Sequence, residues 1–78
     1  MTYVIRHRYD NSVVWFPTTT AGGDNVAPAI YTSMDEAQVS LHLAEAQERQ
    51  IADEGWVDTP MEVYISVATK AEAKWLKQ

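Results

Sequence analysis

The sequence predicts an α+β fold: a small antiparallel sheet of three to four strands, one long helix packed on one face, and a short C-terminal helix. Residues 2–9 and 61–68 alternate apolar and polar side chains, as half-buried strands do. Residues 34–53 carry apolar side chains at helical spacing behind a capping signal at Ser33, and a second capping signal begins at Thr69. The expected order is strand, strand, a short third strand, helix, strand, helix. A length of 78 residues predicts one domain.

The N-terminal part is predicted to form a β-hairpin over residues 2–16. Asp-Asn-Ser at 10–12 is typical of a turn, and Val-Val-Trp-Phe follows it as the second strand. Pro17 ends this strand because proline has no N–H to donate to a ladder. Residues 17–28, which include a Gly-Gly pair, are predicted to be a loop, and 29–32 a short edge strand.

The two predicted helices begin at capping boxes. In Ser-Met-Asp-Glu, which starts at Ser33, the serine hydroxyl accepts from the backbone N–H of the glutamate, whose carboxylate reaches back to the serine N–H. The long helix is expected over residues 34–53 and to stop at Gly55, a typical residue after a helix end. Thr-Lys-Ala-Glu at Thr69 predicts a short helix that continues through Leu76.

The long helix carries two apolar stripes at 100° per residue, and one sheet covers only one of them. The predicted core stripe consists of Ala37, Ser40, Leu41, Ala44 and Ile51. The second stripe, a candidate apolar or dimer interface, consists of Val39, Leu43 and Ala46. Two interpretations of the second stripe stay open. Either the C-terminal helix or the 17–28 loop covers it, or a partner protein or a second copy of the chain does.

Acidic residues are concentrated in one part of the chain. The formal net charge is -5, from 11 acidic and 6 basic residues, and between positions 35 and 62 only Arg49 opposes the carboxylates. Such a surface repels nucleic-acid backbone and attracts basic surfaces, so direct nucleic-acid binding is not expected. The same carboxylates also serve a simpler role, which is to keep a small domain in solution.

A candidate surface for a basic protein partner follows from this charge pattern. Trp56 lies in an acidic turn, a composition typical of binding hot spots, although it could instead fold back against the helix end. Along the helix, Glu45, Arg49 and Asp53 are spaced for i,i+4 ion pairs on a solvated face. The candidate partner-binding residues are Asp35, Glu45, Glu48, Arg49, Asp53, Glu54, Trp56 and Asp58.

Patterns for catalysis or for a cofactor are missing from the sequence. His7 and His42 form no metal-binding motif, and His7 is expected to be a structural histidine in the core. Asp53, Glu54 and Asp58 are the carboxylates that an acid–base enzyme would need, but they lie at a predicted helix end and turn. We therefore expect no enzyme, no metal and no cofactor. With no cysteine, no apolar run of ~20 residues and no signal peptide, a cytoplasmic protein is expected.

The chain resembles small phage- or prophage-encoded accessory proteins, among them anti-CRISPR inhibitors. The likeness lies in Tyr-Val-Ile at 3–5, in Tyr-Thr-Ser-Met-Asp-Glu-Ala at 31–37 before an alanine-rich helix, and in the alternating strand after it. It implies an inhibitor in the host cytoplasm whose acidic surface occupies a basic groove, for example on a CRISPR effector subunit. Arg6, Arg8 and Arg49 interrupt that surface, which argues against pure DNA mimicry. The alternative is a homodimeric structural or assembly protein.

Overall fold

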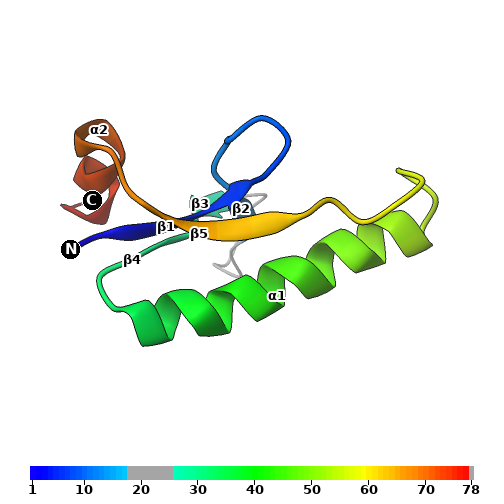
Figure 1. The fold of residues 1–78 in the computed structure, drawn as a ribbon, viewed down its shortest axis with the longest axis horizontal. Helices are drawn as coiled ribbons and strands as arrows, with labels where there is room; N and C mark the ends of the chain where they lie inside the picture. Colours follow the sequence, from blue (N-terminus) through cyan, green and yellow to red (C-terminus); the bar gives the residue numbers. More distant parts are fainter. Residues whose placement is uncertain (18–25, 78) are drawn as a thin grey trace.

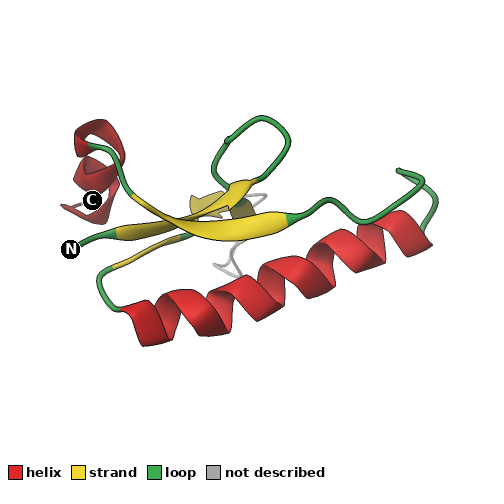
Figure 2. Ribbon diagram, viewed as in Figure 1, coloured by secondary structure: helices red, strands yellow, loops and turns green. Residues whose placement is uncertain are grey.

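A computed structural model describes residues 1–17 and 26–77, and it confirms the α+β class. Figure 1 shows the long helix along one face of the strands and the short C-terminal helices on the other side. Figure 2 shows the same arrangement by secondary structure. The elements are β1 (Tyr3–His7), β2 (Trp15–Pro17), β3 (Val26–Pro28), β4 (Ile30–Tyr31), α1 (Met34–Asp53), β5 (Val63–Val67), α2 (Lys70–Ala73) and the 3-10 helix η1 (Lys74–Lys77).

Strand β1 lies at the centre of a three-stranded antiparallel sheet of order β4-β1-β5. Its register places Ile5 opposite Ile65 and Val4 opposite Ser66. Val4 and Ile5 point to opposite faces of the sheet, and both are fully buried. Both faces of β1 are therefore covered at its centre, whereas the sequence pattern predicts one covered face.

The predicted N-terminal hairpin forms only in part. The chain turns at Asn11, which has a positive φ of 63°, and returns beside β1 through an isolated bridge between Arg6 and Val13. The Val14 N–H then donates to the Ile5 carbonyl at 2.9 Å. From Trp15 onward the chain leaves β1 and pairs with β3 instead, so the second strand belongs to a separate two-stranded sheet.

The predicted loop over residues 17–28 is wrong at its ends. Pro17 is the last residue of β2 and Val26–Pro28 forms β3, with Phe16 opposite Ala27. The centre of the predicted loop lies outside the described residues. The edge strand expected at 29–32 is present as β4, although it is shorter than predicted.

Helix α1 has the predicted bounds, and most of its buried positions toward the sheet are small side chains, with Leu41 packed beside them. The Ser33 hydroxyl accepts from the Glu36 N–H at 3.3 Å, which is one half of the predicted capping box. On the face toward the sheet, Ala37, Ser40 and Ala44 are buried, and Ala44 belongs to the core cluster around Ile5. Small residues let the helix approach the strands closely, so the core is thin.

An ion pair and an aromatic contact hold the C-terminal segment against the second face of the sheet. Thr69 and Glu72 form the predicted capping box, but the α-helix ends at Ala73 and continues as η1. The Arg6 guanidinium donates to both carboxylate oxygens of Glu72, at 2.6 and 2.9 Å. The Trp15 and Trp75 rings add a contact with centroids 5.4 Å apart. A β1 side chain thus fixes the position of α2.

The two ends of α1 lie in different surroundings. Figure 1 shows both chain termini near α2, at the end of the molecule where α1 begins. At the opposite end, the last turns of α1 and the connection to β5 extend beyond the strands. This separation places the helix C-terminus away from the rest of the fold.

Replacing Ala44 by a larger side chain tests the close contact between α1 and the sheet. We expect Ala44→Leu to lower the free energy of unfolding by about 1–3 kcal/mol, because it overpacks a filled site. Ala46→Leu is the matched control on the exposed side of the same helix, where a change within about 0.5 kcal/mol is expected. Urea denaturation measures the free energy of unfolding of both variants. Equal losses in Ala44→Leu and Ala46→Leu would contradict a close contact between α1 and the sheet at Ala44.

The ion pair between Arg6 and Glu72 predicts a pH dependence of stability. The hydrogen bonds from Arg6 hold the pKa of Glu72 below its ordinary value. The stabilisation is therefore complete above the unfolded pKa, ~4.3, and is lost as the pH falls through the lower folded pKa. At neutral pH we expect Glu72→Gln to cost about 1–3 kcal/mol in urea unfolding, and the difference from wild type to shrink in acid.

The exposed pair of Arg8 and Glu62 supplies the control for this pH dependence. These side chains approach within 3.4 Å but are mostly solvated, so Glu62→Gln should change stability little at any pH. A Glu72→Gln variant that is as stable as Glu62→Gln at neutral pH would show that the pair does not hold α2 in place.

Candidate functional site

The C-terminal end of α1 is a defined turn that holds an acidic surface away from the fold. The Trp56 N–H donates to the Ile51 carbonyl at 3.2 Å and the Gly55 N–H to the Ala52 carbonyl at 3.0 Å, the two bonds of a Schellman motif. Gly55 has φ +89°, which favours glycine, as the sequence predicts. We use the name acidic tip for Asp53, Glu54, Trp56 and Asp58.

Trp56 is the most unusual member of the acidic tip because its side chain is exposed. Its backbone closes the Schellman turn, but 77% of the residue remains accessible, so the alternative in which it folds back on the helix is wrong. Asp53, Glu54 and Asp58 lie within three residues of it in the chain and are also exposed. The last turn of α1 contains no basic residue, so Asp53 and Glu54 meet the negative end of the helix dipole without a cation in that turn.

The other predicted partner-binding residues do not join the acidic tip. Asp35 lies in the first turn of α1, about 27 Å along the axis from Asp53. Glu45 approaches His42 at 3.5 Å instead of Arg49, and neither predicted i,i+4 pair of Arg49 is formed. Glu48 is only 4% exposed, so its assignment to a partner-binding surface is wrong. The structure thus gathers four of the eight predicted residues at one end of the helix.

Glu48 faces His7 in a contact that the sequence analysis missed. His7 Nδ1 lies 3.7 Å from Glu48 Oε1 and has no hydrogen-bond partner among the described residues. The expectation that His7 is a satisfied structural histidine of the core is wrong, because its side chain is 19% exposed and its Nδ1 makes no hydrogen bond to the described residues. The spacing of the residues in the sequence could have indicated this contact. Glu48 lies four residues after Ala44, on the same face of the helix, and His7 lies two residues after Ile5, on the same face of the strand.

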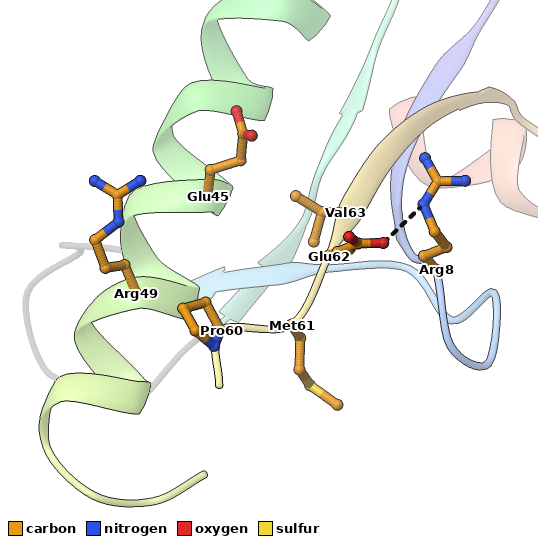
Figure 3. Close-up of a pocket in the computed structure, with 7 residues that line it drawn as sticks. All are labelled: Arg8, Glu45, Arg49, Pro60, Met61, Glu62 and Val63. Atoms are coloured by element: carbon orange, nitrogen blue, oxygen red, sulfur yellow. Dashed lines mark ion pairs between the residues drawn. The ribbon is translucent and has the colours of Figure 1, made fainter. Parts of the chain in front are cut away.

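A groove of about 620 Å³ lies between α1 and the beginning of β5. Figure 3 shows Glu45 and Arg49 extending from α1 on one side, and Arg8 paired with Glu62 on the other. Pro60, Met61 and Val63 complete its lining. This groove carries two cations and two carboxylates, so it is balanced in charge while the chain as a whole is acidic.

The second apolar stripe of α1 remains exposed. Val39 and Leu43 are 64% and 61% accessible, and they line a shallow apolar pocket of about 400 Å³ with Tyr31 at its side. The Tyr31 hydroxyl makes a short hydrogen bond to the Ser40 hydroxyl at the same place. The C-terminal helices lie on the other side of the sheet, so they do not cover this stripe (Figure 1). The other predicted cover, the 17–28 loop, lies largely outside the described residues.

The described residues offer few other chemical sites. No group of three or more His, Asp or Glu side chains is placed to hold a metal ion within residues 1–17 and 26–77. In the same part of the chain, no helix is long and apolar enough to span a membrane. Comparison with models of protein families, with curated proteins and with solved structures finds no match.

The helix dipole predicts opposite effects for the same substitution at the two ends of α1. Asp53→Asn should raise the free energy of unfolding by about 0.5 kcal/mol, because it removes a negative charge from the negative end of the dipole. Asp35→Asn at the N-terminal end should lower it by a similar amount. Urea unfolding at low salt measures both, and a loss of stability in Asp53→Asn would show that this carboxylate supports the fold.

Proposed function

We propose that this chain is a protein-binding module whose acidic tip contacts a basic surface on its partner. The observation that carries the proposal is the exposure of Trp56 among three carboxylates. Tryptophan is enriched in binding hot spots because a large ring that loses water on contact contributes much of the binding energy. The surrounding carboxylates would select a basic partner and guide its approach.

The stability of the fold gives no reason for this arrangement. An exposed tryptophan contributes little burial, and carboxylates at a helix C-terminus oppose the dipole. Features that cost stability and gather in one place are typical of surfaces that serve binding. The extension of the tip beyond the strands supports the same proposal, because a partner groove can receive it without meeting the sheet (Figure 1).

In the specific form of the proposal, the partner is a nucleic-acid-handling complex in the host cytoplasm, such as a CRISPR effector. A groove that binds phosphate backbone is lined by lysine and arginine, whose charges replace the counterions condensed on the nucleic acid. The carboxylates of the acidic tip would occupy that groove, and Trp56 would insert between its side chains. The protein would then act as a competitive inhibitor without chemistry of its own.

The test is target-DNA binding by a purified CRISPR effector ribonucleoprotein, measured by mobility shift with and without this protein. We expect inhibition that weakens steeply with salt, because exposed charge pairs are screened. A variant with Trp56→Ala, Asp53→Asn, Glu54→Gln and Asp58→Asn should lose it. The matched control, Asp35→Asn with Glu36→Gln and Glu45→Gln, removes as many charges elsewhere on α1 and should retain it.

The outcomes separate the general proposal from its specific form. Equal inhibition by the tip variant and the control would remove the acidic tip from the mechanism. No inhibition of any effector tested would remove the specific form. In that case, a basic partner would still be supported if the wild type binds an array of basic peptides and the tip variant does not. If the wild type binds none of these peptides, the general proposal is overturned as well.

The exposed second stripe favours a different candidate function, a homodimeric structural or assembly protein. Val39 and Leu43, with Ala46 beside them, would form the contact between two copies. Leu43→Glu should then convert a dimer to a monomer in light scattering. A mass that is unchanged by Leu43→Glu removes this stripe as the dimer contact.

A further inference from the structure

Within residues 1–17 and 26–77, backbone groups along the outer edge of β5 lack strand partners. The Arg8 N–H donates to the Glu62 carbonyl and the Ala68 N–H to the Thr2 carbonyl, both at 2.9 Å, on either side of the strand. Hydrogen-bonded pairs alternate along an antiparallel ladder, so Tyr64 and Ser66 also direct their N–H and C=O groups to β1. The backbone N–H and C=O groups of Val63, Ile65 and Val67 therefore point away from β1, toward the outer edge of the sheet.

Within the described residues, these outward groups have almost no partners. Only the Val67 carbonyl is approached, by Ser66 Oγ at 3.4 Å and by an Arg6 nitrogen at 3.5 Å, both at the limit of a hydrogen bond. The strand also lacks the usual protection of an edge, since Val-Tyr-Ile-Ser-Val contains no charge, proline or glycine. Such an edge is suited to accept another strand.

We propose that two copies of this chain pair antiparallel through β5. With the two-fold axis at Ile65, each Ile65 lies opposite the partner's Ile65, and Val63 lies opposite the partner's Val67. This register places the outward N–H and C=O groups of each copy against those of the other, so none is left without a partner. An interface between two identical copies must be complementary to itself. In β5 every second residue turns its N–H and C=O groups outward, so a two-fold axis at Ile65 brings the outward groups of one copy against those of the other.

The distribution of charge allows a second copy of the chain to pair at this edge. Two copies with a net charge of -5 each repel one another through their acidic surfaces. The groove beside β5 is the exception, because Arg8 and Arg49 balance Glu45 and Glu62 there. Pairing through β5 places this neutral groove next to the joint and leaves the acidic tip outside it. The dimer therefore does not rest on the proposed inhibitor function.

Amide hydrogen exchange tests the pairing without any mutation. In a monomer, the amides of Tyr64 and Ser66 are protected and those of Val63, Ile65 and Val67 exchange freely. In the dimer all five are protected. We expect the outward amides to become protected as protein concentration rises, together with a doubling of the mass in sedimentation. An alternating pattern and a monomer mass at every concentration would overturn the proposal.

A matched pair of lysine substitutions tests which surface forms the dimer. Val67 and Val39 are both exposed, at 53% and 64%, so lysine is tolerated by the fold at either place. We expect Val67→Lys to weaken dimerisation at least ten-fold, because it places a charge in the joint, and Val39→Lys to leave it unchanged. The reverse result would overturn pairing through β5 and assign the dimer to the second stripe of α1.

Single cysteines give a second test that does not depend on weakening the dimer. The chain has no cysteine of its own, so each variant carries one thiol. Cα atoms of a hydrogen-bonded antiparallel pair are about 5.5 Å apart, within the range of a disulfide. Under mild oxidation, Ile65→Cys should form a covalent dimer, and Leu43→Cys should not. A covalent dimer from Leu43→Cys alone, or from neither variant, would contradict the proposal.

Discussion

The close contact between α1 and the sheet is the constraint on which the remaining structure depends. Ala37, Ser40 and Ala44 bring the helix backbone near β1, where Ile5 supplies the large side chain of the contact. The core is narrow because the apolar helix residues that are fully buried in it are alanines, and only Leu41 adds a larger, partly buried apolar side chain. A narrow contact stabilises the fold through one strip of α1 and leaves the two flanks and the far end of the helix uncovered.

Each uncovered part of α1 has its own chemistry. The flank beside β4 is apolar, with Val39 and Leu43, and the flank beside β5 forms the neutral groove with Arg49. The far end carries the acidic tip around Trp56. A chain this short therefore presents three different surfaces from one helix. This suits a molecule that works by contact and not by catalysis, as we propose.

Local patterns in the sequence were sufficient for the parts of the fold that depend on neighbours along the chain. The capping residues and Gly55 placed the bounds of α1, and alternation placed β5 within two residues. Strand pairing depends on contacts far apart in the sequence, so the partnership of β2 with β3 was missed. Burial of Glu48 was missed because its charge suggested solvent, although its position on the helix placed it beside Ala44.

For the candidate site, the sequence identified the residues of the acidic tip but not their separation from the other carboxylates. Asp53, Glu54 and Asp58 are near neighbours in the chain, so their grouping was predictable, whereas the distance to Asp35 follows only from the length of a straight helix. The exposure of Trp56 was not predictable, because the Schellman turn fixes its backbone and leaves the direction of its ring open.

The position of the chain termini has a practical consequence for how this molecule can be attached to a surface or to another protein. Both termini lie at the end of the molecule where α1 begins, and the acidic tip lies at the other end (Figure 1). A tether joined to either terminus would hold the molecule by its base, with α1 as a rigid arm that carries Trp56 toward solution. Tethered arrays of this protein would thus display the same surface whichever terminus is anchored.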